Sequence, residues 1–195
     1  INKCSFGKKT KLKDAFYPYL SKNSLPVKNN ISLDKNMIVT GPNASGKTTI
    51  LKTVILNLIF SQSYGYGFYS KASVVLYDKI HCYLNIPDTS GRDSLFQAEA
   101  RRCKDIIDSL EDNLKHFCIF DELFSGTNPN EACASSYGFI KYLINRKNMD
   151  FILTTHLLDL CNLLNNDVKN SHMDVNRIDN FNFDYTYRIK SGTSS

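Results

Sequence analysis

The residues best placed to do chemistry lie at positions 41–48, in the pattern G-x-x-x-x-G-K-[ST] of a phosphate-binding P-loop. Gly41 and Gly46 permit backbone angles that a side chain would disfavour, so loop N–H groups can converge on phosphate oxygens. Lys47 would contact the β- and γ-phosphates, and the Thr48 hydroxyl would bind Mg²⁺. The alternative, an accidental glycine-rich turn, is rare at this spacing. The predicted nucleotide-binding residues are Gly41, Pro42, Asn43, Ala44, Ser45, Gly46, Lys47, Thr48 and Thr49.

Two carboxylates follow the apolar run 116–120 and provide the second half of such a site. Asp121 can hold Mg²⁺ through water, as the strand-end aspartate does in P-loop enzymes. Glu122 can act as the general base that polarises the attacking water. The alternative is a solvated acidic turn after a core strand. After a strong P-loop, the pair favours hydrolysis of the bound nucleotide.

Two further side chains are candidates because of their places in the chain. His156 ends the apolar run 150–156, where it could sense the γ-phosphate. A lone strand-end histidine is usually structural, but this order of motifs favours a functional one. Ser94 and Gln97 form a capping box, which predicts a helix from Leu95. A serine at a helix N-terminus can bind an anion, although by itself it is usually only a cap.

These residues must be positioned by alternating strands and helices. Residues 48–60 repeat apolar positions at helical spacing, and residues 95–111, 131–145 and 157–164 are also predicted helices. Predicted strands cover residues 31–33, 37–39, 72–76, 80–84, 116–122, 150–156 and 181–189, the last at an exposed edge, whereas 165–180 is predicted as a polar loop. The pattern predicts an α/β P-loop NTPase with a central, mostly parallel sheet, flanking helices and antiparallel edge strands.

Composition limits the protein class. The chain has 195 residues, 42% hydrophobic content and a net charge of +5, which is ordinary for one globular domain and only weakly indicates a polyanion partner. No stretch is long enough for a membrane helix, and no signal peptide is visible. Six scattered cysteines without C-x-x-C indicate reduced core residues of an intracellular protein rather than disulfides or a zinc site. The first residue is Ile1, so we expect a segment of a longer chain.

Residues 1–30 form a basic approach segment to the core at 31–195, within one domain spanning 1–195. Lysines at positions 8–13 precede aromatic residues at 16–19, a combination that can indicate nucleic-acid contact. We favour the simpler interpretation of one or two edge strands. The aromatic run 64–69 could stack on bases, but a tight turn beside a packed strand is the more common explanation.

The motif order is that of ABC-type ATPases, and four segments resemble the ATPase domain of the MutS family of DNA mismatch-repair proteins. The matching segments are Thr40-Gly-Pro-Asn-Ala-Ser-Gly-Lys-Thr-Thr49, Ser90-Gly-Arg-Asp-Ser-Leu-Phe-Gln-Ala-Glu99, Phe120-Asp-Glu-Leu-Phe-Ser-Gly-Thr-Asn128 and Thr154-Thr-His156. The Gly-Pro-Asn form of the P-loop and the Asp-Glu-x-x-x-Gly-Thr sequence are the specific parts.

The resemblance implies an ATPase that uses ATP and Mg²⁺ and works as a homo- or heterodimer with composite sites. Ser94 would contact the γ-phosphate held by the other subunit, and the turn at 126–128 would lie across the dimer seam. ATP turnover would drive a clamp on double-stranded DNA, held largely by regions outside this segment. No membrane role is evident in the segment.

The chain also departs from the family pattern. The usual Ser-Gly-Arg-Ser signature is one residue longer here, at 90–94, and Tyr69-Ser-Lys71 replaces Val-Pro-Ala. Pro26-Val27 stands where repair proteins commonly place an aromatic residue for the adenine. A MutS-like mechanical ATPase without mismatch recognition, acting in recombination or at a membrane, is therefore the main alternative. An ABC transporter subunit is less favoured, since the L-S-G-G-Q signature and a larger helical insertion are missing, and a P-loop kinase less still.

Overall fold

Strand β4 (Met37–Thr40), which leads into residues 41–48, the predicted phosphate loop, is buried along its whole length. The computed structural model describes residues 1–22, 25–84, 94–177 and 183–193. Within them β4 lies inside a six-stranded sheet of order β11-β10-β4-β9-β8-β7. Its strands pair in parallel, except that β11 is antiparallel to β10 at one edge. The other strands are β7 (Lys79–Tyr83), β8 (His116–Asp121), β9 (Met149–Thr155), β10 (Lys169–Arg177) and β11 (Phe183–Ser191).

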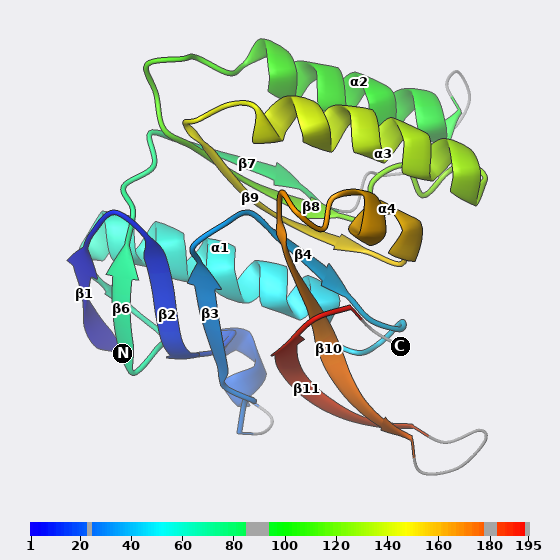
Figure 1. Cartoon of the computed structure of the whole chain (residues 1–195). Coiled ribbons are helices and arrows are strands. Elements are labelled where there is room, and N and C mark those ends of the chain that lie inside the picture. The colour runs from blue at the N-terminus through cyan, green and yellow to red at the C-terminus, as the bar shows by residue number, and fades with distance from the viewer. Residues whose placement is uncertain (23–24, 85–93, 178–182, 194–195) are drawn as a thin grey trace.

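Helices cover both faces of this sheet, as Figure 1 shows. Alternate residues of β4 divide between two cores: Met37 and Val39 pack with α1 (Lys47–Tyr64), and Ile38 packs with the helices opposite. Those helices are α2 (Leu95–Asp108), α3 (Pro129–Ile144) and α4 (Leu158–Leu163). Burial on both faces explains why β4, β8 and β9 read as nearly continuous apolar runs.

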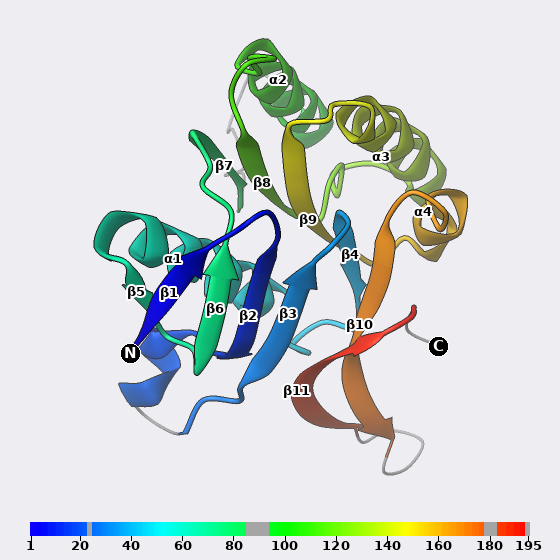
Figure 2. The ribbon, with the colours of Figure 1, turned by 60° about the vertical axis from the view of Figure 1, so that its left-hand side comes forward.

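A second, five-stranded sheet packs on the other side of α1. Its order is β3-β2-β6-β1-β5, and Leu12 and Ile31 from it share one core with Leu51 and Leu58 of α1. Figures 1 and 2 show β1, β6, β2 and β3 side by side in front of α1. Its members are β1 (Asn2–Phe6), β2 (Thr10–Ala15), β3 (Asn29–Leu33), β5 (Tyr66–Gly67) and β6 (Lys71–Val74), and a 3-10 helix, η1 (Pro18–Lys22), follows β2. Because sheets lie on both sides of α1, that helix is buried around most of its circumference.

The mixed α/β class is confirmed, and the predicted helices and strands are present with ends shifted by a few residues. Helix α1 is longer than predicted, ending at Gly65 in the left-handed conformation with φ 74°. The N-terminal segment forms the strands β1 and β2, but the expectation that they are edge strands was wrong: β2 pairs with β3 and β6, and β1 pairs with β6 and β5. β11 is the predicted edge strand, although residues 181 and 182 lie outside the described part.

The prediction of a polar loop at 165–180 was wrong. β10 occupies most of it and pairs with β4 on one side and β11 on the other. Polar composition hid the strand, because its stability comes from two backbone ladders and from inward-facing Ser171 and Met173, which are 3% and 2% exposed.

The cysteine prediction holds for four of the six residues. Cys4, Cys103, Cys118 and Cys161 are buried, and burial raises the pKa of Cys103 to about 12. Cys82 is exposed and Cys133 is partly buried, so these two are not core residues. Among the helices that the structure describes, none combines the length and the apolar character needed to cross a membrane.

Candidate functional site

The phosphate loop turns between β4 and α1 through backbone angles that require its glycines. Gly41 has φ 151° and Gly46 has φ 100°, both in the region that glycine favours. A Cβ at Gly41 would lie 2.8 Å from Ser45 Oγ, and one at Gly46 would lie 3.2 Å from Tyr187 Cδ1. No side chain caps the start of α1, so this helix terminus is suited to an anion.

Lys47 is the central cation of the site and is only 5% exposed. Its Nζ donates to the backbone oxygens of Gly41 at 2.9 Å and Pro42 at 3.2 Å. The same atom lies 3.4 Å from Glu122 Oε1 and 3.0 Å from His156 Nε2. A buried ammonium needs such partners, and these join the loop to the ends of two strands.

Asp121, at the end of β8, faces the start of α1. Thr48 Oγ1 donates to Asp121 Oδ2 at 2.8 Å, and Thr154 Oγ1 donates to Asp121 Oδ1 at 2.5 Å. A hydroxyl and a carboxylate at this separation suit Mg²⁺, which is commonly held by one or two protein ligands together with phosphates and waters. In the described ranges no group of three or more His, Cys, Asp or Glu side chains forms a fuller metal site.

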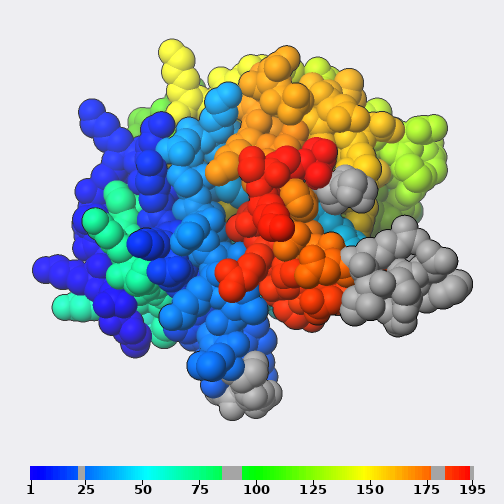
Figure 3. All heavy atoms as spheres, turned by 60° about the horizontal axis from the view of Figure 1, so that its bottom comes forward, coloured from blue at the N-terminus to red at the C-terminus, as the bar shows by residue number. Residues whose placement is uncertain are grey.

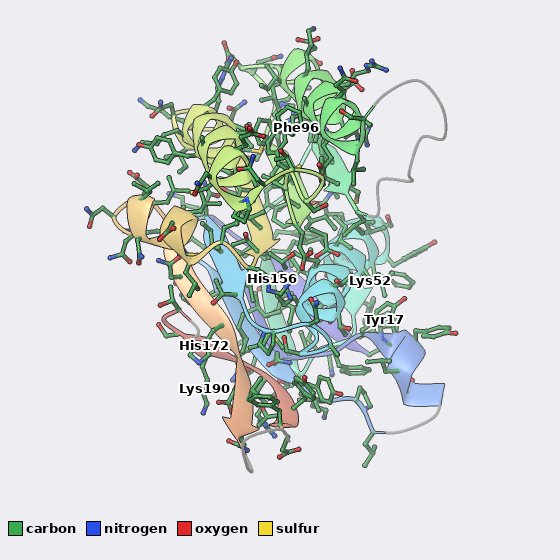
Figure 4. All side chains as sticks on the ribbon, turned by 90° about the vertical axis from the view of Figure 1, so that its right-hand side faces the viewer. Tyr17, Lys52, Phe96, His156, His172 and Lys190 are labelled. Atoms are coloured by element: carbon green, nitrogen blue, oxygen red, sulfur yellow. The ribbon has the colours of Figure 1, made fainter. Side chains whose placement is uncertain are left out.

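Glu122 and His156 meet beside Lys47. His156 Nε2 lies 2.8 Å from Glu122 Oε1 and 2.9 Å from Asn43 Oδ1, and Figure 4 shows His156 beside the start of α1. Glu122 has φ 54°, a strained angle for a residue with a side chain, and its N–H donates to Thr154 O at 3.0 Å. Both side chains are partly exposed, so a water molecule can reach the carboxylate. The structure thus brings together Asn43, Lys47, Thr48, Asp121, Glu122 and His156.

Ser94 lies apart from this cluster. It caps α2 with the predicted capping box: Ser94 Oγ accepts from Gln97 N at 3.3 Å, and Gln97 Oε1 accepts from Ser94 N at 3.1 Å. None of its hydrogen bonds in the described ranges reaches the phosphate loop. Residues 90–93 of the longer signature lie outside the described residues.

Glu99 has a role that sequence reasoning missed. Only 2% exposed, its carboxylate accepts from Ser125 N at 2.9 Å and Gly126 N at 3.2 Å. A Cβ at Gly126 would lie 2.7 Å from Leu95 Cβ, so the turn after Glu122 is packed tightly against the start of α2. The available signal was position: Glu99 falls at helical spacing on the same face as the buried Cys103 and Ile106.

Replacing Glu99 by glutamine should destabilise the domain. The amide keeps the volume but loses the charge and one acceptor oxygen, so the N–H of Ser125 or Gly126 loses its bond to the buried side chain. We expect a loss of about 1–3 kcal/mol in the free energy of unfolding. Urea titration measures it, with Glu111→Gln as the exposed control. Equal midpoints for the two variants would show that Glu99 does not hold the turn.

A cavity of ≈ 460 Å³ adjoins the phosphate loop and the first turns of α1, where Gly46 and Thr49 line it. Pro26 and Val27, which stand where repair proteins commonly place an aromatic residue, line this cavity. Two aromatic side chains from other parts of the chain, Tyr17 and Tyr187, line it with them. Asn29 fixes this arrangement: its Nδ2 donates to Tyr187 O at 3.0 Å, and its Oδ1 accepts from Ile189 N at 2.8 Å. The complete lining is Tyr17, Leu20, Leu25, Pro26, Val27, Asn29, Gly46, Thr49, Ile50, Thr53 and Tyr187.

Comparison with known proteins points to one family. The family described as MutS domain V matches residues 37–195. The chain is 32% identical to mouse (Mus musculus) MutS protein homolog 4 over 93% of its own length and 20% of that protein. It is 26% identical to the DNA mismatch repair protein MutS of Persephonella marina, covering 97% of this chain and 22% of the relative. It is 30% identical to the Endonuclease MutS2 of Thermus thermophilus, covering 82% of this chain and 21% of the relative. The chain therefore spans about a fifth of the length of these relatives.

Proposed function

Since the chain belongs to the MutS family, we propose that it binds ATP with Mg²⁺ and hydrolyses it, as the ATPase module of a MutS-like DNA mismatch-repair protein. One observation carries the proposal: Lys47, the Thr48–Asp121 pair and the Glu122–His156 pair converge where β4, β8 and β9 end. Ligands of open α/β sheets bind at the carboxyl ends of the strands.

The residues divide the chemistry among them. The loop N–H groups and Lys47 would hold the phosphates, and Thr48 and Asp121 would hold Mg²⁺, which neutralises charge on the phosphate oxygens. Glu122 would accept a proton from the attacking water while His156, in contact with its carboxylate, keeps it in position. The cavity lined by Tyr17 and Tyr187 would receive the adenine, because an aromatic ring can stack on a base.

We further propose that the site is completed by a second subunit. Leu95, which follows Ser94, packs against the turn after Glu122, so Ser94 and Thr127 can form one surface. Within the described ranges, the side chains of Ser94 and Thr127 hydrogen-bond to Gln97 and Glu131 and not to the phosphate loop of their own chain, which suits residues that act on a partner's nucleotide. ATP turnover would then drive a DNA clamp in the rest of the protein. Because DNA repair takes place inside the cell, the protein would be intracellular.

Mixing two inactive variants tests the two-subunit site. Ser94→Ala removes the group offered to the partner, and Asp121→Asn removes the Mg²⁺ carboxylate within the chain. Each alone should hydrolyse little ATP, but a 1:1 mixture should recover about a quarter of the parent activity, because half of randomly paired dimers hold one complete site of two. Steady-state phosphate release measures it. Full activity of Ser94→Ala alone would contradict the shared site.

A further inference from the structure

The outer face of the five-stranded sheet carries a shallow basic hollow of ≈ 560 Å³. Four lysines line it: Lys11 and Lys13 on β2, Lys71 on β6, and Lys169 at the start of β10. The other exposed or partly exposed lining side chains are serines and one asparagine. Figures 1 and 2 show these strands facing the viewer, and in Figure 3 the N-terminal strands, β3 and the β10–β11 hairpin adjoin on one surface.

Two of the lysines lie in positions that lower the stability of the sheet. Lys13 and Lys71 are direct cross-strand partners in the antiparallel β2–β6 pair. Like charges placed opposite each other destabilise a sheet, so an arrangement that keeps them suits an anion bound between them. Neither lysine has a carboxylate within 4.0 Å among the residues that the structure describes.

The nearby acidic groups leave this charge largely uncompensated. Asp34 lies at the rim, 3.6 Å from both Lys9 and Lys11. Asp14 Oδ2 accepts from Ser70 Oγ at 2.7 Å. Among the described residues, Lys13, Lys71 and Lys169 form no ion pair, so their charges in the hollow are not neutralised.

The chemistry of the lining favours a nucleic-acid backbone over a protein. The apolar residues of the hollow, Leu12, Ile31 and Ala72, are at most 4% exposed and point into the core, and none of the described large apolar residues that are exposed lines it. Protein interfaces usually have an apolar, aromatic-rich centre, which this face lacks. Lysine, serine and asparagine side chains are the groups that contact DNA phosphates.

We propose that this face contacts the phosphate backbone of double-stranded DNA. The choice of duplex DNA as the polyanion rests on the proposed function, but the basic face itself does not involve the nucleotide site. The basic segment 8–13 thus supplies most of strand β2, inside the five-stranded sheet, and a contact surface through Lys11 and Lys13. The proposal adds a DNA contact within the ATPase module to those expected in the rest of the protein.

The test compares two double variants with the same change in net charge. Lys13→Gln/Lys71→Gln removes the cross-strand pair, whereas Lys104→Gln/Lys147→Gln removes exposed lysines on α2 and after α3. Binding of the 195-residue chain to a fluorescent 30-base-pair duplex is measured by anisotropy at several salt concentrations, without nucleotide. The first variant should bind roughly tenfold more weakly at low salt, and its slope of log K against log salt should fall by about two, since each phosphate contact contributes about 0.9. The control should match the parent.

Folding and specificity have their own readouts. The Lys13→Gln/Lys71→Gln variant should melt no lower than the parent, because a like-charge contact is removed, and Lys13→Arg/Lys71→Arg should keep the binding. If the Lys13→Gln/Lys71→Gln variant does not fold, the single variant Lys71→Gln is measured instead. Weaker DNA binding by the folded single variant than by the parent would support the proposal, and equal binding would overturn it. Equal weakening of the two double variants, no binding by the parent, or equally tight binding of poly-glutamate would overturn the proposal. The ATP measurements below are independent of all these outcomes.

Discussion

Replacing Glu122 by glutamine should abolish ATP hydrolysis while leaving ATP binding nearly unchanged. Glutamine has the same shape and can still accept from His156 Nε2 through Oε1, but it cannot take a proton from water. Loss of a general base lowers the rate by about 10²–10⁴-fold. Single-turnover hydrolysis of radiolabelled ATP, with Mg²⁺ present, measures the effect.

Glu111→Gln is the matched control, because Glu111 is exposed and paired with Lys79 away from the site. Hydrolysis by Glu122→Gln at the parent rate would show that Glu122 is not the base. A parallel loss of ATP binding would instead assign to Glu122 a structural role as the ionic partner of Lys47, whose Nζ lies 3.4 Å away.

Replacing Lys47 by alanine should remove ATP binding itself. The change deletes the lysine whose Nζ contacts the loop, Glu122 and His156 together. Hydrogen bonds to charged groups contribute about 1.5–3 kcal/mol each, so the loss of contacts to two phosphates should weaken ATP binding by at least about 100-fold. Isothermal titration with ATP and Mg²⁺ measures the change.

The control for Lys47 lies on the same helix. Lys52, labelled in Figure 4, is five residues further along α1, and Lys52→Ala should bind ATP like the parent. Equal affinities of the Lys47→Ala variant and the parent for ATP would show that the phosphate loop does not bind ATP. A melting temperature close to that of the parent separates lost contacts from lost folding.

The residues of the proposed nucleotide site could be predicted from the sequence because they stand next to strong local signals. Lys47 and Thr48 follow the second loop glycine, and Asp121, Glu122 and His156 end long apolar strands. Parallel strands bring such ends to one edge of the sheet, so local position was enough to place them together. The capping box at Ser94 is also local, and the structure confirms it.

The missed residues depend on contacts between distant parts of the chain. Tyr187 and Tyr17 line one cavity only because Asn29 joins β3 to β11, a connection across 158 residues. β10 can be polar in composition because backbone hydrogen bonds to the two neighbouring strands stabilise it. Glu99 was visible only as a charged residue on an apolar helix face. Long-range pairing of this kind leaves little trace in local composition, so the five-stranded sheet and its basic face emerged only with the structure.

The most direct test of the ATP site is a titration of the Glu122→Gln and Lys47→Ala variants with ATP and Mg²⁺ under identical conditions. Glu122→Gln does not consume the ligand, so its binding can be followed to equilibrium. We predict saturable binding of one ATP per chain by Glu122→Gln and no saturable binding by Lys47→Ala over the same concentrations. Equal binding of ATP by the two variants would contradict an ATP site built on residues 41–48.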